Sequence, residues 1–89
     1  MSITERINKK LNEALTPSRL EVVDESAKHK GHGGWREGGE THFNVTVVSD
    51  AFDGKSRVDR QRMVYEILAE EMAGPVHALA LTTRTPAEA

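Results

Sequence analysis

A chain of 89 residues makes one small domain with a thin core, because a chain of this size buries only about 60–65% of its unfolded surface. Its composition, 37% apolar and 29% charged, is ordinary for a globular protein, and a net charge of −2 argues against strong sequence-independent binding of nucleic acid, which needs clustered Lys and Arg. Without cysteine the chain has no disulfide and supplies no thiolate ligand. No apolar run approaches the roughly 20 residues of a membrane span, and the first ten residues lack an apolar signal core, so we expect a cytoplasmic protein.

The first element is predicted to be an amphipathic helix. Ser2 and Glu5 have the spacing of a capping box. An apolar stripe at four-residue steps follows, formed by Ile3, Ile7, Leu11 and Leu15. Thr16-Pro17 should end this helix, because the residue before a proline disfavours helical backbone angles.

Two strands are predicted next. Residues 19–24, RLEVVD, are short and rich in β-branched residues, and residues 41–49, THFNVTVVS, alternate between apolar and polar side chains. The two strands should pair antiparallel. His42 falls on the polar face of the second strand, where we expect a structural role, including a hydrogen bond that orients a neighbour.

The connection between these strands is longer than a hairpin needs. Residues 27–43 hold three of the four histidines, five of the seven glycines and the only tryptophan. Long loops in compact domains are usually functional or disordered. His29 and His32 are candidate metal ligands, because neutral imidazole is the commonest ligand side chain. The same residues also fit a solvated polar loop.

The second half predicts a turn, a helix and a last strand. Ser56 should cap a long helix over residues 57–73, which Gly74-Pro75 ends. Residues 76–83 are apolar on both faces, which is typical of a central or covered strand. Thr85-Pro86 resembles a helix start. The order of elements predicts a single α+β domain over residues 1–89, with three strands and helices packed on one face.

His77 stands at the start of the last predicted strand, in PVHALAL. An ionisable group costs free energy in an apolar strand unless it is paired or lies at an edge. His77 is therefore either a core histidine whose ring nitrogens are hydrogen-bonded or a metal ligand.

A basic cluster lies around the start of the second helix and consists of Lys55, Arg57, Arg60 and Arg62. With the preceding turn it could supply a helix-turn-helix that presents side chains to a DNA groove. Acidic residues on the same helix, such as Glu66 and Glu70, equally fit an ordinary salt-bridged face.

The sequence lacks the motifs that would indicate an enzyme. The chain has no nucleophilic cysteine, no serine in an elbow motif and no phosphate-binding glycine loop before a helix. Residues 31–34, GHGG, match the G-x-x-G of KH domains, but that motif joins two helices in a KH domain and would join two strands here. We expect a binding module.

Together, several segments resemble the BolA family: LEVVDES, GETHFNVTVVSDAFDG, SRVDRQRMVYEILAEEM and GPVHALALTTRTP. The resemblance covers nearly the whole chain. It implies a class II KH-like fold, αββααβ with a trailing helix and a three-stranded mixed sheet. It also implies two functions: partnership with a monothiol glutaredoxin around a shared [2Fe–2S] cluster, and DNA binding by a transcriptional regulator.

The resemblance also implies a ligand set. In such heterodimers the BolA-like partner supplies the histidine of the V-H-A-L motif, which is His77 here, and a Cys or His from the loop between the first two strands. His29 matches that loop position after DES, and His32 is the alternative. Histidine on one iron and thiolate on the other is the Rieske pattern, so the thiolates would come from the glutaredoxin and glutathione. Isolated, the protein should be a monomer without a cluster.

Overall fold

The computed structural model describes residues 2–25 and 42–89. The elements follow the order α1 (Ile3–Leu15), β1 (Arg19–Asp24), β2 (His42–Val48), a 3₁₀ helix η2 (Asp50–Phe52), α2 (Arg57–Ile67), α3 (Ala69–Ala73) and β3 (Ala78–Arg84). This confirms the α+β class, and the order is αββααβ with the short η2 added. No described helix is long and apolar enough to cross a membrane.

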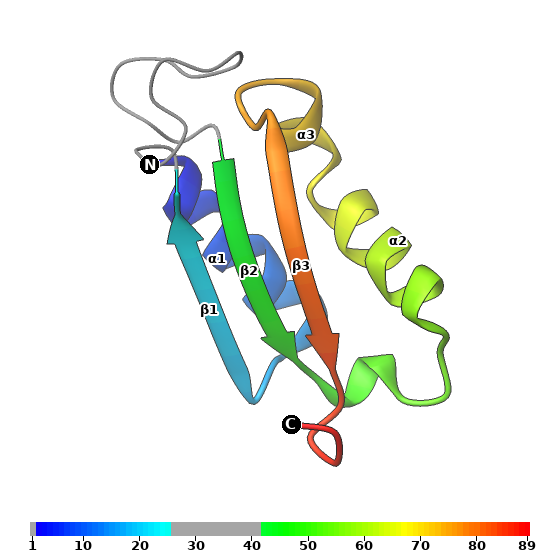
Figure 1. Cartoon of the computed structure of the whole chain (residues 1–89). Coiled ribbons are helices and arrows are strands. Elements are labelled where there is room, and N and C mark those ends of the chain that lie inside the picture. Colours follow the sequence, from blue (N-terminus) through cyan, green and yellow to red (C-terminus); the bar gives the residue numbers. More distant parts are fainter. Residues whose placement is uncertain (1, 26–41) are drawn as a thin grey trace.

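The three strands form one mixed sheet in the order β1-β2-β3. β1 pairs antiparallel with β2, as predicted, and β2 pairs parallel with β3. The end of β1 therefore lies at the same end of the sheet as the starts of β2 and β3 (Figure 1). The prediction that the last strand is central or covered was wrong, because β2 is central and β3 forms an edge, where Ala78 and Ala80 are exposed.

The helices pack on one face of the sheet, as predicted. The core joins the predicted stripe of α1 to the inward face of β2 and to α2 and its end, with the buried residues Ile7, Leu11, Leu15, Phe43, Val45, Val47, Phe52, Val64, Leu68 and Val76. Alternation in β2 therefore determines which residues are buried, as the sequence pattern indicated.

Side-chain caps fix both long helices. The Ser2 hydroxyl accepts a hydrogen bond from the Glu5 N–H at 3.1 Å, and the Ser56 hydroxyl accepts one from the Asp59 N–H at 3.1 Å. Each cap pairs one of the N–H groups that a helix start leaves without a partner. The predicted single helix over residues 57–73 is broken, however, because Leu68 has φ −100° and ψ 20° and separates α2 from α3. Leu68 is itself buried in the core, which holds the break in place.

A buried carboxylate connects α3 to α1. The side chain of Glu71 has no exposed surface, and Lys10 donates a hydrogen bond to it at 2.9 Å. The guanidinium of Arg6 lies 2.6 Å from the second carboxylate oxygen, Oε2, which has no well-directed hydrogen bond. Burial by itself would raise the pKa of Glu71, but the Lys10 hydrogen bond and the two nearby positive charges outweigh it and lower the pKa below its usual value.

Replacing this carboxylate should destabilise the fold. Glu71→Gln removes the charge while keeping the volume, so Arg6 and Lys10 lose their buried counter-ion, and we expect a loss of about 1–3 kcal/mol in urea unfolding at pH 7. The matched control is Glu70→Gln. Glu70 is 79% exposed and pairs with the same cations only at 3.6 and 3.9 Å, so its replacement should change stability by less than about 0.5 kcal/mol.

The pH dependence follows from the lowered pKa of Glu71. The unfolded chain binds a proton at this group more readily than the folded chain, so the stabilisation is complete well above the ordinary pKa of 4.5 and is lost as the pH falls below it. The difference between wild type and Glu71→Gln should therefore be larger at pH 7 than at pH 3. An equal difference at both pH values would show that the charge of Glu71 contributes nothing.

Candidate functional site

Two regions of the described chain carry the residues that the sequence singled out. The first, which we call the histidine end, is the end of the sheet where β1 stops and where β2 and β3 start (Figure 1). There the N–H of Glu25 donates to the carbonyl of His42 at 2.8 Å, and His42 is the register partner of Ala78. Residues 26–41 thus connect two positions that the sheet holds side by side.

His77 and His42 meet at the histidine end. His77 is exposed and comes directly before β3, while His42 is buried, with 6% of its surface accessible. Their ring centroids are 5.4 Å apart and the rings are tilted by 52°. A shallow pocket of about 250 Å³ lies beside His42 and is lined by Glu25, His42, Phe43, Ala78, Leu79 and Ala80.

Two neighbouring imidazoles form only part of a metal site. Among residues 2–25 and 42–89, no group of three or more His, Cys, Asp or Glu side chains is placed to hold a metal ion. The other two candidate ligands, His29 and His32, lie outside the described residues. Within the described residues, the histidine end therefore offers one exposed imidazole, His77, whose ring lies beside a second, buried imidazole.

The second region, which we call the basic surface, contains Lys55, Arg57, Arg60 and Arg62. Its positive charges are less available for binding than the sequence suggested. Arg60 is only 13% exposed and makes a two-pronged contact with Glu88, with Nη1 at 2.6 Å from Oε1 and Nη2 at 3.2 Å from Oε2. Its Nε also donates to the carbonyl of Lys55 at 3.0 Å. Arg60 therefore holds the C-terminal turn against α2.

Glu88 was missed by the sequence reasoning, because 28 residues separate it from Arg60. A local signal was present: Thr85 and Glu88 have the capping-box spacing, and the Thr85 N–H donates to Glu88 Oε1 at 2.8 Å. The hydrogen bond from Arg60, followed by that from the Thr85 backbone, lowers the pKa of Glu88 to about 2. The pair is therefore ionised at neutral pH.

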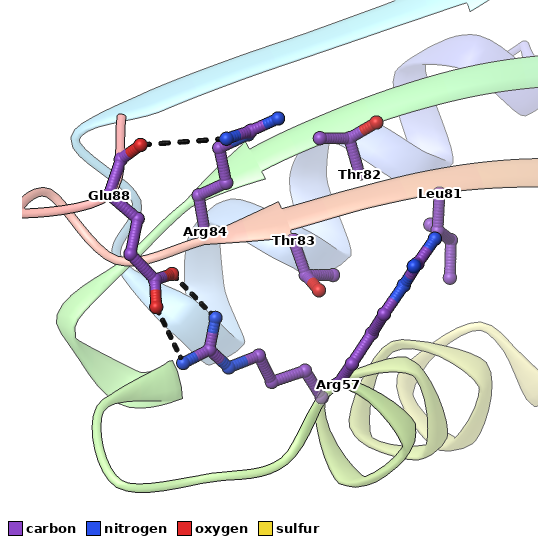
Figure 2. A pocket seen from close by; sticks show the side chains of 7 residues that line it. Arg57, Leu81, Thr82, Thr83, Arg84 and Glu88 are labelled. Atoms are coloured by element: carbon purple, nitrogen blue, oxygen red, sulfur yellow. Dashed lines mark hydrogen bonds and ion pairs between the residues drawn. The ribbon is translucent and has the colours of Figure 1, made fainter.

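The remaining cations differ in their surroundings. Arg62 is 72% exposed and lies 3.7 Å from Asp59, a weak pair one helical turn away. Arg57 lines a groove of about 390 Å³ between the start of α2 and the end of β3, and its side chain extends toward the edge of β3 near Leu81 (Figure 2). The predicted helix-turn-helix is incomplete, since the element before the turn is a 3₁₀ helix of three residues, Asp50–Phe52.

Comparison with known proteins identifies relatives along nearly the whole chain. The sequence model of the family described as BolA-like protein matches residues 11–88. The chain is 51% identical over 85 residues to the DNA-binding transcriptional regulator BolA of Escherichia coli, covering 96% of this chain and 77% of that protein. It is 48% identical over 87 residues to SufE-like protein 1, chloroplastic/mitochondrial, of Arabidopsis thaliana, covering 93% of this chain but 24% of that longer protein.

A solved structure shows the same fold. The BolA domain of SufE1 from Arabidopsis thaliana superposes with a TM-score of 0.90 at 47% identity, over 100% of this chain and 98% of that one. The superposition therefore includes all three strands and the basic surface at the start of α2. The α+β architecture described above is shared with this relative from end to end.

The Arg60–Glu88 contact can be tested by titration. We expect NMR of the side-chain carboxyl to give Glu88 a pKa near 2, and Arg60→Gln to raise that pKa toward 4.5 because the largest cause of the shift is removed. The stabilisation from this pair should be present above pH 4.5 and be lost as the pH falls toward 2. Arg62→Gln is the control and should leave the Glu88 pKa unchanged; an equal rise in both variants would contradict the assignment.

Proposed function

The chain belongs to the BolA family, and from that premise we propose that it is a non-enzymatic partner of a monothiol glutaredoxin that shares a [2Fe–2S] cluster with it. The observation that carries this proposal is the position of His77. It is an exposed imidazole at the end of the sheet from which residues 26–41 depart, and it lies beside His42. An exposed, neutral imidazole is a suitable nitrogen ligand for iron.

The donor set of the chain fits a shared cluster. The chain offers imidazoles and has no cysteine, whereas [2Fe–2S] centres need four ligands and those of the Rieske type combine histidine with thiolate. His77 and a loop histidine, His29 or alternatively His32, would hold one iron. The glutaredoxin cysteine and glutathione would supply the thiolates, so cluster binding should require the heterodimer.

We infer that His42 positions His77 and is not itself a ligand. Its ring is buried and packs at 5.4 Å from the ring of His77. A buried ring limits the rotamers that the exposed ring can adopt without collision. The His77 side chain therefore loses part of its rotamer freedom when the protein folds. Ligation then costs less additional conformational entropy.

The alternative function is that of a DNA-binding transcriptional regulator that uses the basic surface. It is supported by the name of the Escherichia coli relative and by Arg57, which has no ion-pair partner among residues 2–25 and 42–89. Against it stand the net charge of −2 and the ion pair that already engages Arg60. We place it second.

The ligand assignment predicts a clear spectroscopic result. When the protein is mixed anaerobically with a cluster-loaded monothiol glutaredoxin and glutathione, visible CD and EPR should show a mixed histidine and thiolate centre, and the two proteins should co-elute. His77→Ala should abolish the histidine signature while the far-UV CD spectrum stays unchanged, because His77 is exposed and outside the core. His42→Phe, which keeps a ring against His77, should alter the EPR g-values without abolishing ligation.

Alanine variants at His29 and His32 identify the loop ligand. We expect His29→Ala to change the spectrum and His32→Ala to leave it intact. If the double variant and His77→Ala both retain the mixed-ligand spectrum, ligation by His29, His32 and His77 is excluded. Stoichiometric iron and sulfide in the protein purified alone would equally exclude the shared-cluster proposal.

For the alternative, we expect DNA binding to be weak and strongly salt-dependent. Each lost phosphate contact lowers the slope of log K against log salt by about 0.9. Arg57→Ala and Arg62→Ala should each have this effect, and Arg60→Ala should have a smaller one because Glu88 already holds its guanidinium. Tight, sequence-selective binding at physiological salt that is lost in the triple variant would make DNA binding the main function.

A further inference from the structure

The outer edge of β3 carries backbone groups without partners. The carbonyl of Arg84 accepts from the N–H of Ser49, so the backbone groups of Arg84 point toward β2. The direction alternates along a strand, and the carbonyl of Leu79 accordingly accepts from the Tyr65 hydroxyl of α2, at 3.4 Å on the opposite side. By the same alternation, the N–H and C=O groups of Leu81 and Thr83 point outward.

These outward groups border the groove of about 390 Å³ on the open side of β3. Within the part of the chain that the structure describes, no hydrogen bond joins the outward N–H and C=O groups of Leu81 and Thr83 to another residue. An edge strand of this kind is a template for a further strand. The start of α2 forms the other wall, so the groove has a strand on one side and a helix on the other (Figures 1 and 2).

The charges in the groove favour an acidic occupant. Arg57 has no ion-pair partner among the described residues, and Arg84 makes only a long contact of 3.5 Å, to the backbone carbonyl of Glu88. The one acidic side chain in the lining, Glu88, is neutralised by Arg60. The groove therefore carries two uncompensated positive charges beside a row of backbone donors and acceptors.

We propose that this groove binds an extended acidic peptide segment of a partner protein, which adds to β3 as a fourth strand. The peptide backbone would pair with Leu81 and Thr83, and its carboxylates would contact Arg57 and Arg84. This is the strand-addition mode of recognition, in which backbone pairing supplies affinity and side-chain contacts supply selectivity. The inference goes beyond the proposed function and does not depend on the histidine end.

A peptide fits the groove better than a nucleic-acid backbone does. The outward edge alternates N–H donors with C=O acceptors, and another strand complements both. Phosphate oxygens only accept hydrogen bonds, so they would leave the carbonyls of Leu81 and Thr83 facing negative charge. The net charge of −2 acts in the same direction.

The test uses the full chain and the capped hexapeptide Glu-Glu-Val-Glu-Glu-Val, which as a strand carries carboxylates on both faces, as contact with both Arg57 and Arg84 requires (Figure 2). In ¹⁵N-labelled protein, titration should shift the amide signals of Leu81 and Thr83 first. Arg57→Glu should weaken binding at least tenfold. The control is Arg62→Glu, which makes the same charge change on the same helix outside the groove lining and should leave the affinity within twofold.

Two further probes separate strand addition from its rivals. The same peptide with N-methylated amides keeps its charge but cannot pair as a strand, so it should bind at least tenfold more weakly. A single-stranded oligonucleotide of six thymidines should bind more weakly than the peptide. Equal binding of the N-methylated peptide, equal weakening by Arg62→Glu, or tighter binding of the oligonucleotide would each overturn the proposal.

Discussion

The buried carboxylate of Glu71 is the interaction on which the candidate site depends. Its side chain is held by Arg6 and Lys10 of α1, and its backbone carbonyl accepts from the N–H groups of Gly74 and Val76. The residue after Val76 is His77. One buried charge therefore fixes where α3 ends against α1 and where the chain enters β3. A full carboxylate is tolerated in this position because two cations and the hydrogen bond from Lys10 offset its desolvation, which would otherwise be prohibitive in so small a core.

The parallel pairing of β2 with β3 accounts for the arrangement of both proposed surfaces. A parallel strand must return from the far end of the sheet, so the chain runs through η2, α2 and α3 before it reaches His77. That crossover places the start of β3 beside the start of β2, which brings His77 to His42. It also leaves β3 at the edge with α2 alongside, and this forms the groove lined by Arg57. The same connection thus produces the histidine end and, farther along the strand, the open edge.

Local sequence patterns predicted most helices and strands. They could not predict contacts between residues that lie far apart in the sequence. The alternation of residues 41–49 predicted β2 and its buried face, and two serine caps predicted the starts of α1 and α2. The apolar pattern of residues 76–83 misplaced β3 at the centre, because small alanines tolerate an exposed edge as well as a covered position. Nothing local marked Glu71 as buried, since its partners lie 61 residues away in the case of Lys10. The ligand roles of His29, His32 and His77 stay predictions, of which only His77 lies in the described chain.

The order of the two proposed functions follows from what each needs at neutral pH. DNA binding needs free cations, but the pKa of Glu88 near 2 keeps its carboxylate ionised across the physiological pH range, so Arg60 keeps a charged partner there. Freeing it would mean breaking a two-pronged contact and releasing the C-terminal turn, a cost that phosphate binding would have to offset. His77 needs no such rearrangement, because it is already exposed and its neighbouring ring is already in place. A surface that is ready to bind is favoured over one that must first open, since the free energy of opening is subtracted from every contact made afterwards.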